Sequence, residues 1–224
     1  MIKQIQQGVV LNGSEYYHIL CSFVVSDDEA AGVGGTLLKY IKEGYNVIKV
    51  IFSSGEMSHP HYKKEVIVKE RIDETIKISK KYGIKETIFF ELEDAKLKEN
   101  INNKIKIKIK DLIKKYDPFK VFIPSEHDPH VDHRAVYNSV LNVLKSIKYN
   151  KDIYSYEVWN VVKEDKPVVY VDITKNFKRK VKMMKEFRSQ WHFMYPLLLP
   201  IYFRARYYGL KAGCKCAERF YKLK

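Results

Sequence analysis

Two short clusters in the sequence hold residue types that bind metal ions or transfer protons. The first is acidic, Ser26-Asp27-Asp28-Glu29, and the second, residues 127–134, has the sequence His-Asp-Pro-His-Val-Asp-His-Arg. Carboxylates in a row are by themselves typical of a solvated turn or a helix N-cap. A cluster with three of the seven histidines of the chain is better explained by metal binding or acid–base chemistry. We therefore interpret the two clusters as parts of one hydrolytic site.

This interpretation requires a fold that brings the clusters together. An apolar, partly β-branched segment, His18–Val25, precedes the first cluster, and a second predicted strand, Lys120–Ile123, precedes the other. In an open parallel sheet, ligands bind in the crevice outside the carboxyl ends of the strands. Both clusters are expected at that edge.

The rest of the chain alternates between strand and helix patterns. This alternation predicts an α/β, three-layer Rossmann-like fold with a mainly parallel sheet, and we expect residues 1–224 to form a single domain. The Lys-Ile repeat of residues 104–110 is assigned to a helix because its wider apolar pattern follows i, i+4 spacing. The further predicted strands are 46–52, 87–90, 153–162 and 168–171, and the predicted helices are 36–43, 63–82, 101–116, 135–146 and 174–189.

A glycine-rich stretch follows the acidic cluster and invites comparison with nucleotide-binding loops. Gly32, Gly34 and Gly35 do not form a G-x-G-x-x-G pattern, and three acidic residues precede them where a pyrophosphate would approach. We expect these glycines to permit close packing between a helix and a strand.

Charge is distributed unevenly along the chain. There are 41 Lys and Arg and 27 Asp and Glu, so the net charge is +14. Residues 175–224 hold 14 basic and two acidic residues, a net charge of +12, and residues 1–174 are nearly neutral. We expect a basic, aromatic appendix at 175–224 that faces an anionic or lipid-linked substrate or a membrane surface. A nucleic-acid partner is not expected, because the rest is nearly neutral and carries no RNA-binding motif.

Several features bear on the cellular compartment. Three cysteines with no C-x-x-C spacing favour a reducing, cytoplasmic setting, and residues 1–13 lack the apolar core of a signal peptide. The most apolar stretch, residues 193–203, is interrupted by Pro196 and Pro200 and is too short to cross a bilayer. Peripheral membrane contact is compatible with its aromatic residues.

Several separated motifs resemble those of the PIG-L/LmbE-like N-acetylglucosaminyl deacetylases. Members of this family share a His-Pro-Asp-Asp-Glu motif after the first strand and a later His-x-Asp-His motif. The corresponding residues here are Val25-Ser26-Asp27-Asp28-Glu29 and His130-Val131-Asp132-His133. Further similarities are found at residues 53–56, 71–74 and 204–220, so the resemblance spans residues 17–222.

The resemblance implies a zinc-dependent N-deacetylase acting on an N-acetylglucosamine-type sugar or sugar conjugate. By this pattern Asp28 and His133 would bind Zn²⁺, and Asp27 would be the general base. His130 would stabilise the oxyanion or protonate the leaving amine, and Asp132 would orient the His130 side chain. Arg71 would bind substrate hydroxyls or phosphate, although a surface salt bridge with Asp73 or Glu74 explains it equally well.

Val25 departs from the family pattern, because it stands where the first histidine ligand would be. A catalytic zinc ion normally has three protein ligands and a water molecule. Three consequences are open. The protein could bind little metal and act in carbohydrate binding or regulation without catalysis. It could instead use a different metal that prefers oxygen ligands, or another residue could replace the missing histidine ligand. The candidate substitutes are Asp27, His59, His61 and His127, although for His59 and His61 we favour an exposed loop over a ligand role.

Overall fold

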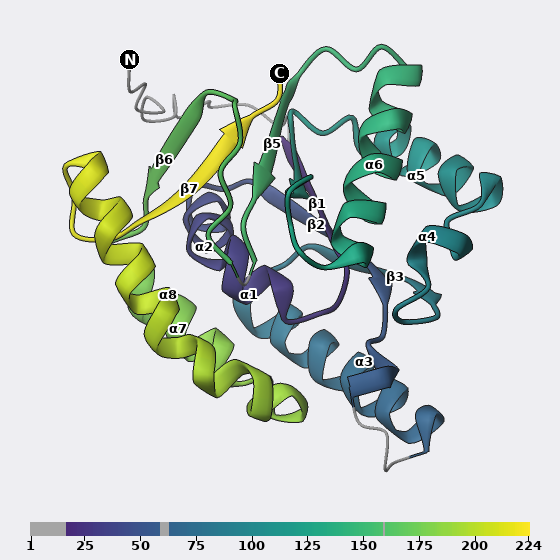
Figure 1. Ribbon diagram of the computed structural model, residues 1–224, viewed down its shortest axis with the longest axis horizontal. Coiled ribbons are helices and arrows are strands. Elements are labelled where there is room, and N and C mark those ends of the chain that lie inside the picture. Colours follow the sequence, from purple (N-terminus) through teal and green to yellow (C-terminus); the bar gives the residue numbers. More distant parts are fainter. Residues whose placement is uncertain (1–16, 59–62, 159) are drawn as a thin grey trace.

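The computed structural model describes residues 17–58, 63–158 and 160–224. These residues form a sheet of seven strands covered by helices on both faces (Figure 1). The strands are β1 (His18–Phe23), β2 (Asn46–Ser53), β3 (Glu86–Leu92), β4 (Lys120–Pro124), β5 (Asp152–Tyr156), β6 (Val168–Asp172) and β7 (Ala217–Lys222). The helices are α1 (Asp28–Gly32), α2 (Gly34–Lys42), α3 (Lys64–Tyr82), α4 (Leu97–Asn100), α5 (Asn103–Tyr116), α6 (Val131–Ser146), α7 (Phe177–Met184) and α8 (Trp191–Ala212), with short 3₁₀ turns at Glu56–Ser58 and Arg188–Gln190.

The sheet order is β3-β2-β1-β4-β5-β7-β6, and β1 to β5 pair in parallel. From β1 the chain first adds strands on one side, β2 and then β3, and afterwards crosses to β4 on the other side. β1 and β4 therefore flank the point where the strand order reverses, which is where open α/β sheets bind ligands. The predicted α/β three-layer fold with a mainly parallel sheet is confirmed.

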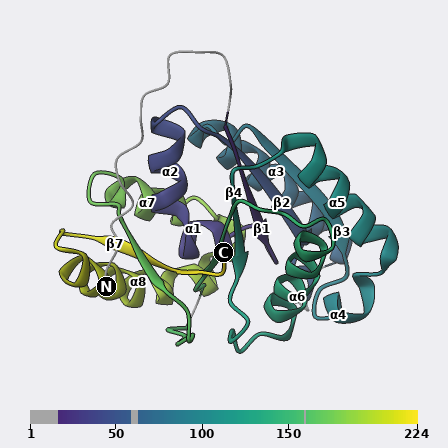
Figure 2. The ribbon, with the colours of Figure 1, turned by 90° about the horizontal axis from the view of Figure 1, so that it is seen from above.

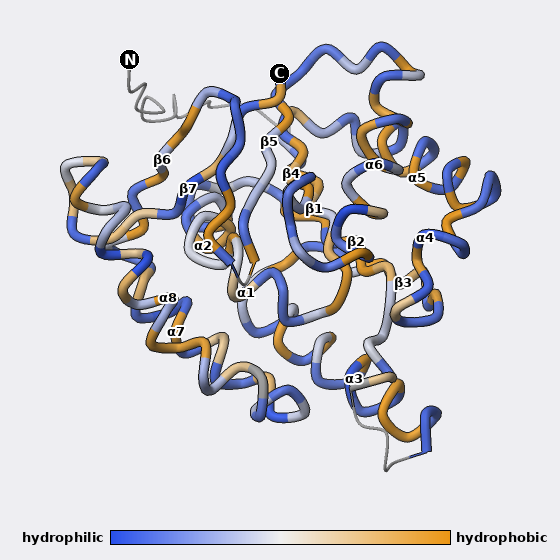
Figure 3. Tube along the Cα trace, in the orientation of Figure 1, coloured by the Kyte–Doolittle hydropathy of each residue, from blue (hydrophilic) through white to orange (hydrophobic). Residues whose placement is uncertain are grey.

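Two apolar clusters separate the sheet from its helical layers. Alternate residues of β1 point to opposite faces, as the twofold period of a strand requires. Ile19 and Cys21 belong to the cluster beneath α1, α2, α7 and α8, whereas Leu20 belongs to the cluster beneath α5 and α6. Figure 2 shows these two groups of helices on opposite sides of the sheet, and Figure 3 shows that the central strands are mostly hydrophobic.

The lysine-rich helix forms as its apolar spacing predicts. Ile105, Ile109 and Ile113 are buried on one face of α5, and the lysines between them are exposed. The side chain of Asn102 caps the helix by accepting a hydrogen bond of 3.2 Å from the Ile105 N–H. Four-residue periodicity thus outweighs the local Lys-Ile alternation that would suit a strand.

Several predicted boundaries were wrong. β5 ends at Tyr156 rather than at residue 162, and α7 covers only part of the predicted helix 174–189. Helix α6 begins at Val131, four residues before the predicted start, because His130 provides an N-cap. The second half of the cluster, residues 131–134, therefore lies in the first turn of a helix, whereas residues 127–130 lie in the loop before it.

The basic C-terminal segment is not the appendix that its composition suggested. Its last strand, β7, lies inside the sheet and pairs antiparallel with β5 on one side and β6 on the other. The preceding helix, α8, packs against β6 and β7. Neither element had been predicted. For α8 the reason is that Pro196 and Pro200 lie within it and obscure the helical pattern.

The glycines after the acidic cluster have the packing role expected of them. A Cβ atom at Gly32 would lie 2.7 Å from the Tyr156 ring, and one at Gly35 would lie 2.6 Å from Ile173. The N-terminal end of α2 is capped by the carboxylate of Glu218, which accepts hydrogen bonds of 2.9 Å and 2.7 Å from the N–H groups of Gly35 and Thr36. The chain's own anion occupies the position that a phosphate would need.

Candidate active site

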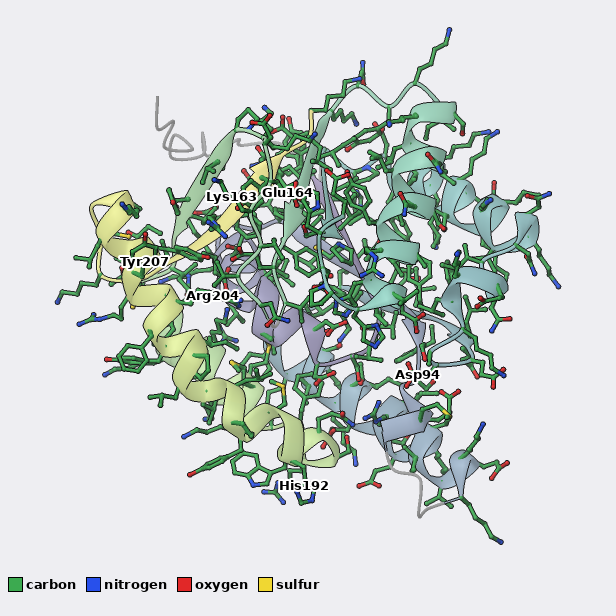
Figure 4. The ribbon with its side chains drawn as sticks, viewed as in Figure 1. Asp94, Lys163, Glu164, His192, Arg204 and Tyr207 are labelled. Atoms are coloured by element: carbon green, nitrogen blue, oxygen red, sulfur yellow. The ribbon has the colours of Figure 1, made fainter. Side chains whose placement is uncertain are left out.

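A pocket of about 520 Å³ opens at the carboxyl ends of β1 and β4. Both sequence clusters contribute to its wall, so the fold brings together residues about a hundred positions apart. The lining includes Asp27, Asp28, Arg71, Asp128, His130 and His133. Asp94, labelled in Figure 4, follows β3 and also lines the pocket.

The acidic cluster is buried at the end of β1. Asp28 begins the short helix α1, and its Oδ2 atom accepts a hydrogen bond of 3.0 Å from the Val25 N–H. Asp27 and Asp28 are 2% and 1% exposed, and the Oδ1 atom of each has no hydrogen-bond partner among the described residues. Because burying an unpartnered carboxylate oxygen is costly, these two atoms indicate a place for a ligand.

The environment of Asp27 suits proton transfer near neutral pH. Burial and the neighbouring charge of Asp28 raise the pKa of Asp27 to about 7, although the guanidinium of Arg71 opposes the shift. A general base works best when its pKa is near the working pH. Asp27 can therefore accept a proton from a bound water molecule.

Glu29, the third acidic residue, has a different position. It forms a buried ion pair with Lys49 of β2, with 2.5 Å between Oε1 and Nζ. It does not line the pocket. Its contribution is to join α1 to the sheet.

His130 lies at the mouth of the pocket as the N-cap of α6. Its Nδ1 atom accepts a hydrogen bond of 3.2 Å from the Asp132 N–H. In the neutral ring this bond assigns the proton to Nε2, which can then donate to a bound molecule. His130 is thus equipped to protonate a leaving group.

Asp132 contacts His130 through its backbone rather than through its carboxylate. The Asp132 side chain is buried, and its Oδ1 atom accepts a hydrogen bond of 3.1 Å from the Leu97 N–H. That bond joins the start of α6 to α4.

His133 is held between two carboxylates. Its Nε2 atom lies 3.3 Å from Oδ2 of Asp28, and its Nδ1 atom lies 2.9 Å from Oδ1 of Asp128. Burial of the ring opposes protonation, but the two carboxylates outweigh burial and raise the pKa of His133 to about 10. The ring is therefore protonated at neutral pH in this arrangement.

Sequence reasoning assigned no role to Asp128. Besides facing His133, its Oδ1 atom accepts a hydrogen bond of 2.8 Å from the His130 N–H. It is 2% exposed. The sequence signal for this role is a carboxylate two residues before an N-cap histidine. It would have identified Asp128 as a residue that positions the rings of His130 and His133.

Arg71 is a pocket residue and not a surface residue. It is 3% exposed, and its Nη1 atom donates a hydrogen bond of 2.8 Å to the Ser54 carbonyl. Gly55 makes room for it, because a Cβ atom there would overlap the guanidinium. The alternative of an exposed salt bridge with Asp73 or Glu74 is therefore wrong.

The residues present do not fit the three-ligand zinc site of the family pattern. Asp28 and His133 lie together, but Val25 lines the pocket and has no metal-binding atom. Within the described ranges, no three side chains of His, Cys, Asp or Glu are arranged to hold a metal ion. Among the described residues, the zinc site expected from Asp28 and His133 is incomplete.

Of the proposed substitute ligands, Asp27 and His127 lie within the described residues, and neither completes the site. His127 is exposed and lies 3.8 Å from Glu126, and it is not among the pocket residues. Asp27 lines the pocket but is not part of a metal-binding group in the described chain. His59 and His61 lie outside the described residues.

Comparison with known proteins identifies proteins of similar sequence and fold. The chain is 24% identical over 220 residues to diacetylchitobiose deacetylase from Thermococcus kodakarensis, covering 89% of this chain and 80% of that protein. The structure of N,N'-diacetylchitobiose deacetylase from Pyrococcus horikoshii superposes with a TM-score of 0.77 at 23% identity, covering 92% and 83% of the two chains.

A hydratase has the same fold. The structure of GalB, the 4-carboxy-2-hydroxymuconate hydratase of Pseudomonas putida, superposes with a TM-score of 0.79 at 17% identity, covering 93% of this chain and 96% of that one. Deacetylation and hydration are thus both found on this fold, and the fold alone does not identify the reaction.

The family comparison is more specific. The model of the PIG-L family, described as GlcNAc-PI de-N-acetylase, matches residues 26–144, which is more than half of the chain and includes both clusters. The chain belongs to the PIG-L family, as its motifs predicted.

Proposed function

We propose that this protein hydrolyses the N-acetyl amide of an N-acetylglucosamine-type sugar, or of a conjugate that carries one. The main support is the juxtaposition of Asp27, His130 and Arg71 around one pocket at the strand-order reversal. Membership of the PIG-L family and the deacetylase relatives agree with this chemistry.

Asp27 and His130 have different roles in the proposed amide hydrolysis. Asp27 takes a proton from a water molecule whose oxygen forms a bond to the acyl carbon. The C–N bond then breaks, and Nε2 of His130 gives a proton to the leaving nitrogen. The products are a carboxylic acid and an amino sugar, and water is the only co-reactant.

Arg71 has the position of a substrate-binding group. Its guanidinium is fixed by the Ser54 carbonyl, so little side-chain freedom is lost on binding. It can donate to sugar hydroxyls or to a phosphate of an anionic conjugate.

Zinc is the cofactor that the family pattern implies, but the proton transfers assigned to Asp27 and His130 do not depend on it. Asp28 and His133, which lie 3.3 Å apart, would supply two of the three protein ligands, and Val25 has no atom that could supply the third. Metal content is therefore a measurement to be made alongside activity.

A second candidate function is carbohydrate binding or regulation without catalysis. Val25 favours this candidate, because loss of a ligand lowers metal affinity while leaving the pocket and Arg71 intact. Under both proposals the protein binds the same class of sugar, but only under the first does it hydrolyse the sugar.

Acetate release from free, nucleotide-linked and lipid-linked N-acetyl sugars tests the proposal. We expect release by the wild type and a loss of about 100-fold or more in Asp27→Asn, with sugar binding retained. Asp165→Asn, an exposed matched change, should be fully active. Sugar binding without acetate release, at any metal content, would support the second candidate instead, and absence of both would contradict both.

A further inference from the structure

Helix α8 presents an apolar face to solvent along the outer edge of the molecule (Figure 1). Trp191, Tyr195, Leu199 and Phe203 recur every four residues and form one stripe. Leu199 and Phe203 are each 63% exposed, and Leu210, further along the same face, is 81% exposed.

The opposite face of α8 already has its partners. Met194, Ile201, Ala205 and Tyr208 are buried against the rest of the protein. Arg204 lies on the side of α8 that faces the sheet (Figure 4), where its Nη2 atom donates hydrogen bonds to the carbonyls of Ala31 and Val158. The helix is therefore apolar on an inner face that packs and on an outer face that has no partner in the described structure.

Positive charge surrounds the outer stripe. Arg206 and Lys211 lie on α8 and are exposed, with Arg206 6.0 Å from the centre of the Tyr202 ring. The two acidic residues of 175–224 do not offset this charge, because Glu218 is buried against Lys180 and Glu186 pairs with Lys81. The surface next to the stripe therefore attracts anions.

Two partners could cover such a stripe: a second copy of this chain or an anionic lipid surface. A symmetric contact between two copies would place Arg206 and Lys211 of both copies beside one interface, and α8 has no acidic residue to pair with them, which is unfavourable. Anionic lipid headgroups complement the same charges, and Trp and Tyr side chains suit the boundary between headgroups and acyl chains. The positive charge beside the stripe therefore favours an anionic lipid surface over a second copy of this chain.

We propose that α8 docks on the surface of an anionic bilayer, lying in its plane with the stripe of Trp191, Tyr195, Leu199 and Phe203 inserted among the headgroups. At 22 residues the helix is about 33 Å long, enough for an extended contact. No helix in the described part of the chain is long and apolar enough to span a membrane.

Docking would also orient the pocket. Gln190, the residue directly before α8, is part of the pocket lining. The N-terminal end of the membrane-bound helix would therefore border the pocket. The docking proposal does not depend on the proposed function, since it concerns a different surface.

Sedimentation of the full chain with vesicles tests the proposal. We expect binding to phosphatidylcholine vesicles that contain phosphatidylserine, and much weaker binding to phosphatidylcholine alone or at high salt. Leu199→Ser and Phe203→Ser should each weaken binding by about tenfold or more. Arg206→Glu should weaken it by at least about fivefold, from the contribution of one basic residue.

Matched controls lie on α5, on the other face of the sheet. Ile107→Ser replaces an apolar side chain that is 58% exposed, and Lys106→Glu reverses an exposed positive charge. Both should bind vesicles like the wild type, and circular dichroism should show every variant folded. Equal losses in α5 and α8 variants, or no binding to either vesicle, would overturn the proposal. A concentration-dependent dimer that Leu199→Ser abolishes, without vesicle binding, would assign the stripe to a second copy instead.

Discussion

At the scale of single residues, the site is defined by neighbouring carboxyl groups that have different partners. Asp27 and Asp28 each have one buried oxygen atom without a partner among the described residues, but the other oxygen of Asp28 is held by the Val25 N–H and faces His133. Asp128 faces the other nitrogen of His133. Adjacent side chains can therefore differ in role, one available to accept a proton and the others fixing an imidazole.

Replacing Val25 by histidine should supply the missing metal ligand. Val25→His places an imidazole in the pocket wall beside Asp28 and His133, and we expect its zinc affinity to rise by about 10–100-fold. Competition with a chelating dye measures this affinity. Val25→Ala removes the same side chain without adding a donor, so equal affinities of the two variants would contradict the prediction.

Replacing Asp128 by asparagine should change the titration of His133. The variant keeps an oxygen acceptor for the His130 N–H but removes one of the two charges that raise the pKa of His133. We expect that pKa to fall below about 10 in Asp128→Asn, as followed by NMR of the ring protons in metal-free protein. Asp165→Asn serves as the control, and an unchanged pKa in Asp128→Asn would show that Asp128 does not act on the ring.

At the scale of elements, one buried carboxylate joins three parts of the fold. Glu218 of β7 caps the N-terminal end of α2 and lies 2.5 Å from Nζ of Lys180 on α7. Lys180 also donates a hydrogen bond to the Ala31 carbonyl of α1. The layer that carries the acidic cluster is thereby attached to the C-terminal strand.

Removing this carboxylate should destabilise the protein strongly. Glu218→Ala leaves the Lys180 ammonium buried without its partner and the α2 N–H groups uncapped, so we expect a loss of about 3–5 kcal/mol in the free energy of unfolding. Urea denaturation measures it. Lys81→Ala removes an exposed ion-pair partner and should cost about 0–1 kcal/mol. Similar values for the two variants would show that the buried pair is unimportant.

At the scale of the whole molecule, the sheet is completed by the end of the chain. β7 lies between β5 and β6, so the last residues are as much a part of the core as β1. Phe220 of this strand is 1% exposed, and its ring lies 5.1 Å from that of Phe122 on β4. The sheet thus depends on a contact between residues far apart in the sequence.

This contact predicts a large effect of a single change in β7. Phe220→Ala should lower the free energy of unfolding by about 3–5 kcal/mol, because it leaves a cavity between the strands and the helical layer. Lys222→Ala, in the same strand but partly exposed, should have a much smaller effect. Calorimetry of both variants checks the prediction, and comparable melting temperatures would contradict it.

The sequence by itself determined the features that depend on local spacing. Buried strands and four-residue periodicity predicted the α/β fold and most of its elements, including α5. Their positions directly after predicted parallel strands also implied that Asp27, Asp28, His130 and His133 would lie at one edge of the sheet, and these residues do line one pocket. Such features are predictable because neighbouring residues in the chain carry the pattern.

Only the tertiary structure decided the features that depend on distant partners. It placed Arg71 in the pocket rather than on the surface, set Asp128 against His133, and inserted β7 into the sheet. It also showed that the basic segment divides into buried pairs, such as Lys180–Glu218, and an exposed aromatic helix. The physical reason is that burial and charge pairing join residues far apart in the chain, and these long-range contacts leave no periodic pattern in the sequence around either partner.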